Sequence, residues 1–161
     1  MEYLILFLPL IGSIISGFFG KTIGDRLSQL ITCILVSISA LLSLFIFFKV
    51  VSSGYEHNAI IATWINSGSL NVNWSIKVDA LSAVMLVVVT LVSSLVHIYS
   101  VGYMSHDPHK PRFMSYLSLF TFAMLTLVTS DNFLQLFFGW EGVGLCSVSY
   151  THLTLPTTML V

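Results

Sequence analysis

Long runs of apolar residues, each about the length needed to cross a bilayer, dominate the pattern of this chain. A membrane-spanning helix needs about 20 mostly apolar residues, because a rise of about 1.5 Å per residue must cover about 30 Å of hydrocarbon. Five segments meet this requirement, namely residues 3–19, 27–48, 80–103, 113–130 and 132 to about 150. Since every backbone polar group in hydrocarbon needs a partner within its own segment, we expect all five to be helices.

The stretch between the second and third apolar runs has a different periodicity. Apolar side chains occupy every second position there, at Leu70, Val72, Trp74, Ile76 and Val78. Alternation of this kind is typical of a β-strand, and the earlier run 60–65 with the turn-prone residues 66–69 provides a partner strand and a connection. We therefore predict a small hairpin against the membrane surface, with Trp64 and Trp74 at the interface, where indole rings are favoured.

Composition agrees with a membrane-embedded chain. Of the 161 residues, 56% are hydrophobic and 8% are charged, and the mean hydropathy is +0.94, whereas about a quarter of the residues of soluble domains are charged. The net charge is −1, so no basic surface exists for nucleic acid, and the lipid bilayer is the expected surroundings. The fold class is therefore all-α integral membrane, with about five transmembrane helices and a small extramembrane β-hairpin between the second and third.

The loops between the predicted helices differ in their content of Lys and Arg. The loop after the first helix contains Lys21 and Arg26, the loop after the third contains Lys110 and Arg112, and the hairpin region has two basic residues, Lys49 and Lys77. Because short basic loops stay on the cytoplasmic or matrix side, both of the first two loops are predicted inside. The amino terminus and the hairpin then lie outside.

Small residues on the first predicted helix indicate close helix packing. Gly12, Ser16 and Gly20 recur every four residues and clear one face for a neighbouring helix. This helix has no basic segment before it and no small-residue cleavage site, so we expect it to be retained rather than removed as a signal peptide. No internal repeat or linker divides the chain, which indicates one membrane domain.

Glu141 is the one ionisable residue that falls deep inside a predicted span. Ten residues separate it from Asp131 in the turn before the fifth helix, and at about 1.5 Å each they cover about 15 Å, half of a hydrocarbon core of about 30 Å. A charged side chain there costs about 2.5–3.5 kcal/mol on insertion scales, so such residues usually face a cavity and serve ion or proton movement. A neutral, hydrogen-bonded structural glutamate is the alternative, and position alone leaves both open.

Three glycines, Gly139, Gly142 and Gly144, surround Glu141. A glycine costs about 1 kcal/mol relative to alanine in a helix interior, so something is expected to compensate. The glycines could permit a local bulge, access of water or close approach of another helix beside the carboxyl group. Ordinary packing of small residues explains the pattern equally well.

The remaining polar residues give weaker indications of chemistry. His97 is a possible proton relay, since imidazole exchanges protons near neutral pH, but a lone helical histidine is more often structural. His106, Asp107 and His109 have the side chains of a metal site, yet they lie in a basic, proline-flanked loop whose expected role is topological. Cys33 and Cys146 lack metal-ligand spacing and are expected to pack. We predict no metal and no cofactor-binding residue in this chain, since it has no Gly-rich nucleotide fingerprint and no cysteine cluster.

Four motifs resemble one family. They are Val-Asp-Ala-Leu-Ser at 78–82, Tyr-Ser-Val-Gly-Tyr-Met at 99–104, Arg-Phe at 112–113 and, most specifically, Gly-Trp-Glu-Gly-Val-Gly-Leu-Cys-Ser at 139–147. These motifs are similar to those of the L-type subunit, or chain 5, an antiporter-like subunit of respiratory complex I (NADH-quinone oxidoreductase). The resemblance covers residues 1–147. Subunits of multisubunit cation/proton (Na⁺/H⁺) antiporters share the architecture and are the alternative.

The resemblance implies a function and partners. Glu141 matches the family's buried glutamate, which pairs with a lysine on a later helix and takes part in proton translocation; that lysine is absent here. NADH, FMN, iron-sulfur clusters and quinone would be bound by partner subunits, and the other membrane subunits, especially the M-type antiporter-like subunit, would be neighbours. The expected location is the bacterial inner membrane, with the mitochondrial inner membrane as the alternative.

Residues 148–161 depart from the family pattern. A family member would continue after Ser147 with Tyr-Leu-Leu-Ile-Gly-Phe-Trp, whereas this chain has polar Thr151, His152 and Thr154 followed by Pro156. Such residues are poor continuation for a membrane helix, so a truncated reading frame or foreign tail is expected, poorly ordered or only loosely helical. The activity would then belong to the parent subunit, and the fragment alone would be inactive.

Overall fold

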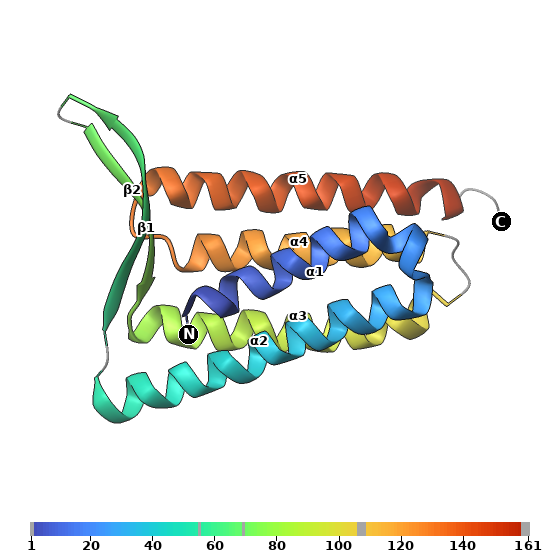
Figure 1. Cartoon of the computed structure of the whole chain (residues 1–161), viewed down its shortest axis with the longest axis horizontal. Coiled ribbons are helices and arrows are strands. Elements are labelled where there is room, and N and C mark those ends of the chain that lie inside the picture. Colours follow the sequence, from blue (N-terminus) through green and yellow to red (C-terminus); the bar gives the residue numbers. More distant parts are fainter. Residues whose placement is uncertain (1, 55, 69, 106–108, 159–161) are drawn as a thin grey trace.

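The chain folds as a bundle of helices with a hairpin across one end (Figure 1). The structure, a computed structural model, describes residues 2–54, 56–68, 70–105 and 109–158. Within them the elements in chain order are α1 (Glu2–Ile23), α2 (Asp25–Ser53), β1 (His57–Ser67), β2 (Leu70–Val78), α3 (Ala80–Tyr103), α4 (Lys110–Val128) and α5 (Phe133–Thr158). The predicted fold class, five helices with a hairpin between the second and third, is confirmed.

Four of the helices, α1 to α4, are long and apolar enough to cross a membrane. The chain is therefore a membrane protein. Helix α5 runs alongside α4 and packs chiefly against it (Figure 1). Its described side chains end at residue 149, so α5 as a fifth span remains a prediction. Helix α4 is central, because it contacts each of the other four helices.

The bundle has an apolar exterior and an interior that holds polar as well as apolar side chains. Hydroxyl-bearing side chains are fully buried between the helices, among them Thr32, Ser39, Ser43, Thr90 and Ser118. Large apolar side chains point outward, among them Phe18, Leu41, Phe48, Leu81, Leu95 and Trp140. An apolar exterior suits lipid, whereas buried hydroxyl groups bond between helices that have no hydrophobic drive to associate in lipid.

Hydroxyl pairs connect neighbouring helices of the bundle. Ser43 Oγ on α2 lies 2.7 Å from Thr90 Oγ1 on α3, and Ser13 Oγ on α1 lies 3.2 Å from Ser115 Oγ on α4. Such bonds average about 0.6 kcal/mol in membrane proteins. They therefore set helix register more than they supply stability.

The small residues of α1 permit the close approach that their spacing predicts. A Cβ atom at Gly20 would lie 2.5 Å from Cβ of Pro111 on α4, so only glycine fits there. Ser16 Oγ lies 2.6 Å from Ser28 Oγ on α2 and donates to the Pro111 carbonyl oxygen at 2.7 Å. Gly12 also faces α2, at Thr32 and Leu35. The packing face predicted for this helix is confirmed.

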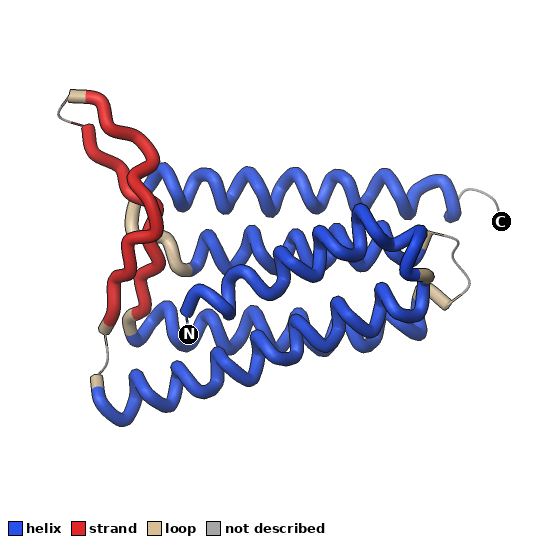
Figure 2. The backbone as a smooth tube through the Cα atoms, viewed as in Figure 1, coloured by secondary structure: helices blue, strands red, loops and turns tan. Residues whose placement is uncertain are grey.

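The hairpin is antiparallel and irregular. Its register runs from His57 opposite Val78 to Ser67 opposite Leu70, with shifts between Ile60 and Ala62 and between Thr63 and Ile65. Strand β1 has 11 residues and β2 has 9, so the two extra residues of β1 form these irregularities. The first strand is longer than the predicted 60–65. Figure 2 shows the hairpin crossing the end of the bundle and projecting beyond α5.

The connections sort to two ends of the bundle. The start of α1, the hairpin and the turn between α4 and α5 lie at one end, and the α1–α2 and α3–α4 connections lie at the other (Figure 1). The two basic loops therefore share one end, as expected. Which end faces the inside of the membrane remains a prediction from loop charge.

The expectation of a loosely helical tail is wrong, because α5 continues as a helix from Phe133 to Thr158, well past Ser147. Threonine and histidine have only modestly lower helix propensity than alanine. Pro156 lies in the last turn, so its missing N–H group removes one backbone hydrogen bond, to the carbonyl oxygen four residues earlier, while the helix ends two residues later. A proline near a helix end is therefore compatible with a helical backbone.

Candidate functional site

Glu141 lies in an apolar groove between α4 and α5. The groove has a volume of about 340 Å³. Besides Glu141, its lining residues are Leu119, Phe122 and Ala123 of α4 and Phe138, Gly142, Leu145 and Cys146 of α5. The Glu141 side chain is exposed and, among the residues described, has no hydrogen-bond or ion-pair partner. A single carboxyl group thus stands in an otherwise apolar, open-sided groove.

Two of the three glycines around Glu141 allow α5 to approach α4 closely. A Cβ atom at Gly139 would lie 2.8 Å from the Cα atom of Leu127, and one at Gly142 would lie 3.2 Å from Cβ of Ala123. Gly144 faces open space. Helix α5 is a continuous α-helix here, so a bulge is excluded and close approach is the alternative that the geometry supports.

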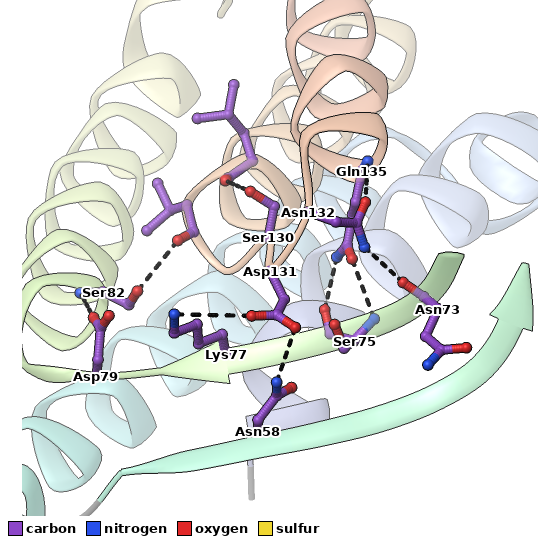
Figure 3. Close-up of polar contacts among 12 residues, drawn as sticks. Asn58, Asn73, Ser75, Lys77, Asp79, Ser82, Ser130, Asp131, Asn132 and Gln135 are labelled. Carbon is purple, nitrogen blue, oxygen red and sulfur yellow. Dashed lines mark hydrogen bonds and ion pairs between the residues drawn. The ribbon is translucent and has the colours of Figure 1, made fainter. Parts of the chain in front are cut away.

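Polar side chains at the start of α5 attach it to the hairpin (Figure 3). Asn132 caps the helix, since its Oδ1 accepts from Gln135 N at 2.8 Å, and its Nδ2 donates to the Asn73 carbonyl oxygen at 2.8 Å. The fully buried Gln135 bonds to both the N–H and the C=O group of Ser75. The sequence analysis missed this contact, although a glutamine inside an otherwise apolar helix was the available signal.

An aromatic cluster extends the contact between the hairpin and α5. Phe138 packs edge-on against Trp64 and Trp74, with ring centroids 6.0 and 5.0 Å apart. The two indoles lie 5.2 Å from each other. The tryptophans predicted at the membrane interface therefore come together, and they contact the helix that carries Glu141.

His97 is fully buried between α3 and α4. Its Nδ1 lies 2.7 Å from the Ser93 carbonyl oxygen, and its Nε2 lies 3.0 Å from Ser118 Oγ. Neither Ser93 nor Ser118, the two residues that bond to His97, lines the Glu141 groove. The structure therefore does not bring the two predicted proton-carrying residues into one site.

Charged groups gather where the hairpin meets the helices. Asp131 Oδ1 lies 3.8 Å from Lys77 Nζ, and Asp131 Oδ2 accepts from Asn58 Nδ2 at 2.9 Å. Asp79 caps α3, because its Oδ1 accepts from Ser82 N at 2.7 Å. That backbone hydrogen bond is the main reason that the pKa of Asp79 lies below its usual range.

Among the other residues singled out from the sequence, the structure describes His109, Cys33 and Cys146. His106 and Asp107 fall outside the described residues, and His109 is at the N-cap position of α4. Cys33 is partly buried on α2 and belongs to no disulfide. Cys146 is buried beside Glu141 in the groove, where it packs as expected.

Comparison with known proteins gives the family. The model of "NADH-Ubiquinone oxidoreductase (complex I), chain 5 N-terminus" matches residues 64–114. Curated proteins named NADH-ubiquinone oxidoreductase chain 5 are 54% identical over 94% of this chain in Arabidopsis thaliana, 53% over 94% in Triticum aestivum and 53% over 89% in Phytophthora infestans. The chain belongs to the complex I chain 5 family. The resemblance read from the four motifs is confirmed.

The match covers only part of each relative. This chain spans 23% of the chain 5 protein of Arabidopsis thaliana, 23% of that of Triticum aestivum and 22% of that of Phytophthora infestans. The chain 5 segment seen here thus comprises a helical bundle, the hairpin at its end and the groove with Glu141.

Proposed function

We propose that this chain is part of a proton-translocating membrane subunit of NADH-ubiquinone oxidoreductase, in which Glu141 carries the proton. The observation that supports the proposal most directly is the position of Glu141 in the groove between α4 and α5, surrounded by apolar side chains. Glu141 lies eight residues, or about 12 Å, from the first residue of α5. That depth places the carboxyl group well inside the hydrocarbon layer if α5 spans the membrane.

A carboxyl group at such a place can alternate between two states. An apolar environment favours the protonated form of a carboxyl group, and a nearby cation favours the ionised form. The resemblance to L-type subunits implies a lysine on a later helix as that cation. Its approach and withdrawal along the open side of the groove would release and restore the proton on Glu141.

The redox chemistry belongs to other subunits in this proposal. NADH, FMN, iron-sulfur clusters and quinone are bound by partners, and this chain contributes to the enzyme by moving protons. The M-type antiporter-like subunit is the proposed neighbour. The names of the chain 5 relatives favour this role over that of a subunit of a cation/proton antiporter.

The proposed location is the inner mitochondrial membrane rather than the bacterial cell membrane. The relatives come from two plants and from Phytophthora infestans, all of them eukaryotes. Immunodetection of the full-length subunit in purified mitochondria of the source organism tests the location.

Substitution of Glu141 in the complete enzyme tests the function. Glu141→Gln keeps the size and hydrogen-bonding capacity of the side chain but removes its titration, so the number of protons pumped per electron should fall while the complex still assembles. Glu56→Gln is the matched control, since Glu56 is exposed in the connection between α2 and the hairpin. A complex with Glu141→Gln that pumps at the unmodified ratio would show that Glu141 is structural.

A further inference from the structure

Gln135 makes a paired contact with the backbone of a single hairpin residue, Ser75. Its Oε1 accepts from Ser75 N at 3.1 Å, and its Nε2 donates to the Ser75 carbonyl oxygen at 2.8 Å. The Gln135 side chain is fully buried. A primary amide used in this way takes the place of a neighbouring strand, because it offers one donor and one acceptor to one residue of β2.

The same edge of β2 makes two further contacts with the segment that leads into α5, and Figure 3 draws the one between Asn73 and Asn132. Lys77 N donates to the Thr129 carbonyl oxygen at 2.9 Å, and the Asn73 carbonyl oxygen accepts from Asn132 Nδ2 at 2.8 Å. These contacts use backbone groups of residues 73, 75 and 77. Because these are alternate residues of the strand, their N–H and C=O groups point to the same edge. The edge of β2 that does not pair with β1 is thus occupied by the α4–α5 segment.

We propose that Gln135 is a positioning residue for Glu141, because its amide fixes the rotation and the depth of α5 against the rigid edge of β2. The inference rests on the proposed function of Glu141. It assigns to the hairpin the role of holding the helix that carries the proton-exchanging carboxyl group.

Helix geometry gives the reason that such a contact matters at Glu141. The two residues are six positions apart, about 9 Å along one uninterrupted helix. A slip of one residue would turn α5 by about 100° and shift it by about 1.5 Å, which would carry Glu141 out of the groove beside Ala123. Phe138 lies halfway between them and packs on Trp64 and Trp74, so the hairpin contacts continue toward Glu141.

Other contacts of α5 restrict its rotation less. Helix α5 packs chiefly on α4, and the closest approach there, at Gly139 and Gly142, brings smooth helix surfaces together without a directional bond. Hydrogen bonds require a defined direction, whereas contacts between small residues tolerate sliding. Gln135, together with the bond from Asn132 to Asn73 at the start of the helix, therefore supplies the angular restraint.

Two substitutions of Gln135 in the complete complex test the inference. Gln135→Leu removes both bonds to Ser75. Gln135→Glu restores them when the new carboxyl group is protonated, since a carboxylic acid offers the same donor and acceptor, and loses them when it is ionised. Gln29→Leu is the matched control, because Gln29 is also a buried glutamine but lies on α2.

The position of α5 is measured directly as the distance between spin labels at Asn71 on the hairpin and Val148 on α5, both exposed. Gln135→Leu should broaden the distance distribution and lower the pumping rate by roughly ten-fold, because a misplaced reacting group loses rate steeply. In both readouts, Gln135→Glu should match the unmodified protein at the lowest pH at which the complex is stable. At the highest such pH it should approach Gln135→Leu. Gln29→Leu should leave both readouts unchanged.

Two results would overturn the inference. One is an unchanged distance distribution in Gln135→Leu. The other is a Gln135→Glu complex whose distance distribution at acidic pH is as broad as that of Gln135→Leu. Failure of the proposed function gives a different result, namely normal pumping by Glu141→Gln with the spin-label distances unaffected.

Discussion

Gly139 of α5 lies so close to Leu127 of α4 that a Cβ atom at position 139 would come within 2.8 Å of the Leu127 Cα atom. The obstacle is backbone, which cannot turn aside as a flexible side chain can. Overpacking of this kind costs about 1–3 kcal/mol. We predict that Gly139→Ala pushes α5 away from α4 and lowers the thermal stability and yield of the assembled complex.

Gly144→Ala separates this clash from the general effect of replacing a glycine. A Cβ atom at Gly144 would meet nothing within 4 Å. Alanine is favoured over glycine in a helix by about 1 kcal/mol, so Gly144→Ala should be neutral or stabilising. Equal losses of stability in the two variants, measured as unfolding midpoints in detergent, would contradict the prediction.

The cap of α3 by Asp79 predicts a dependence of stability on pH. The hydrogen bond from Ser82 N holds the pKa of Asp79 below its usual range in the folded chain. The stability that it contributes is therefore present above the unfolded pKa, about 3.9, and is lost as pH falls through the lower folded pKa. We expect amide exchange at the start of α3 to accelerate in that acidic range.

Two variants isolate the cap from other effects of acid. Asp79→Asn keeps an oxygen acceptor but does not titrate, so its first turn of α3 should show no such step with pH. Asp79→Ala removes the acceptor and should cost about 1 kcal/mol at neutral pH. Acid-dependent exchange that persists unchanged in Asp79→Asn would assign the effect to another group.

The spans and the hairpin could be predicted because their signals are local. Apolar runs of about 20 residues and strict alternation from Leu70 to Val78 need no knowledge of partners. The packing face of α1 was predictable for the same reason, since Gly12, Ser16 and Gly20 recur at the spacing of one helix face. The structure adds the neighbours that these faces contact.

The attachment of α5 to the hairpin could not be predicted in the same way. Gln135 and Ser75 are 60 residues apart in the chain. No periodicity in the sequence predicts that a side-chain amide will bond to the backbone of a residue so far away. The separate placement of His97 and Glu141 also depends on how α4 is rotated between its neighbours. Both features follow from three-dimensional packing, which single-sequence patterns do not contain.

The boundary after Ser147 remains a prediction from sequence. The departure from the family pattern begins at Val148, and the helical backbone through Thr158 does not distinguish native from foreign sequence. Sequencing the gene and its transcript across this position checks it. A continuous native reading frame that encodes Val148 onward would contradict the prediction.

The arrangement of loops predicts how each end can be labelled from the two sides of the membrane. Ser67 on the hairpin and Ser105 after α3 are both exposed, and the hairpin and the α3–α4 connection lie at opposite ends of the bundle. With Cys33 and Cys146 replaced by alanine, a cysteine at 67 should react with an impermeant reagent from the outside. A cysteine at 105 should react only from the inside, and its labelling from the outside would show that the orientation is inverted.

The contacts of His97 predict that it holds α3 to α4 and does not relay protons. A carbonyl oxygen only accepts, so Nδ1, at 2.7 Å from the Ser93 oxygen, carries a proton, and Nε2 pairs with the hydroxyl group of Ser118 at 3.0 Å. Both nitrogens of a fully buried ring are thus engaged in hydrogen bonds to neighbouring groups.

Replacement of His97 in the complete complex distinguishes the two roles. His97→Leu should lower stability by about 1 kcal/mol through loss of the bond to Ser118, and Ser118→Ala should do the same. Complexes that assemble with either change should pump the unmodified number of protons per electron, because neither His97 nor Ser118 lines the Glu141 groove. A His97→Leu complex that assembles fully but pumps fewer protons, while Ser118→Ala pumps normally, would make His97 a relay.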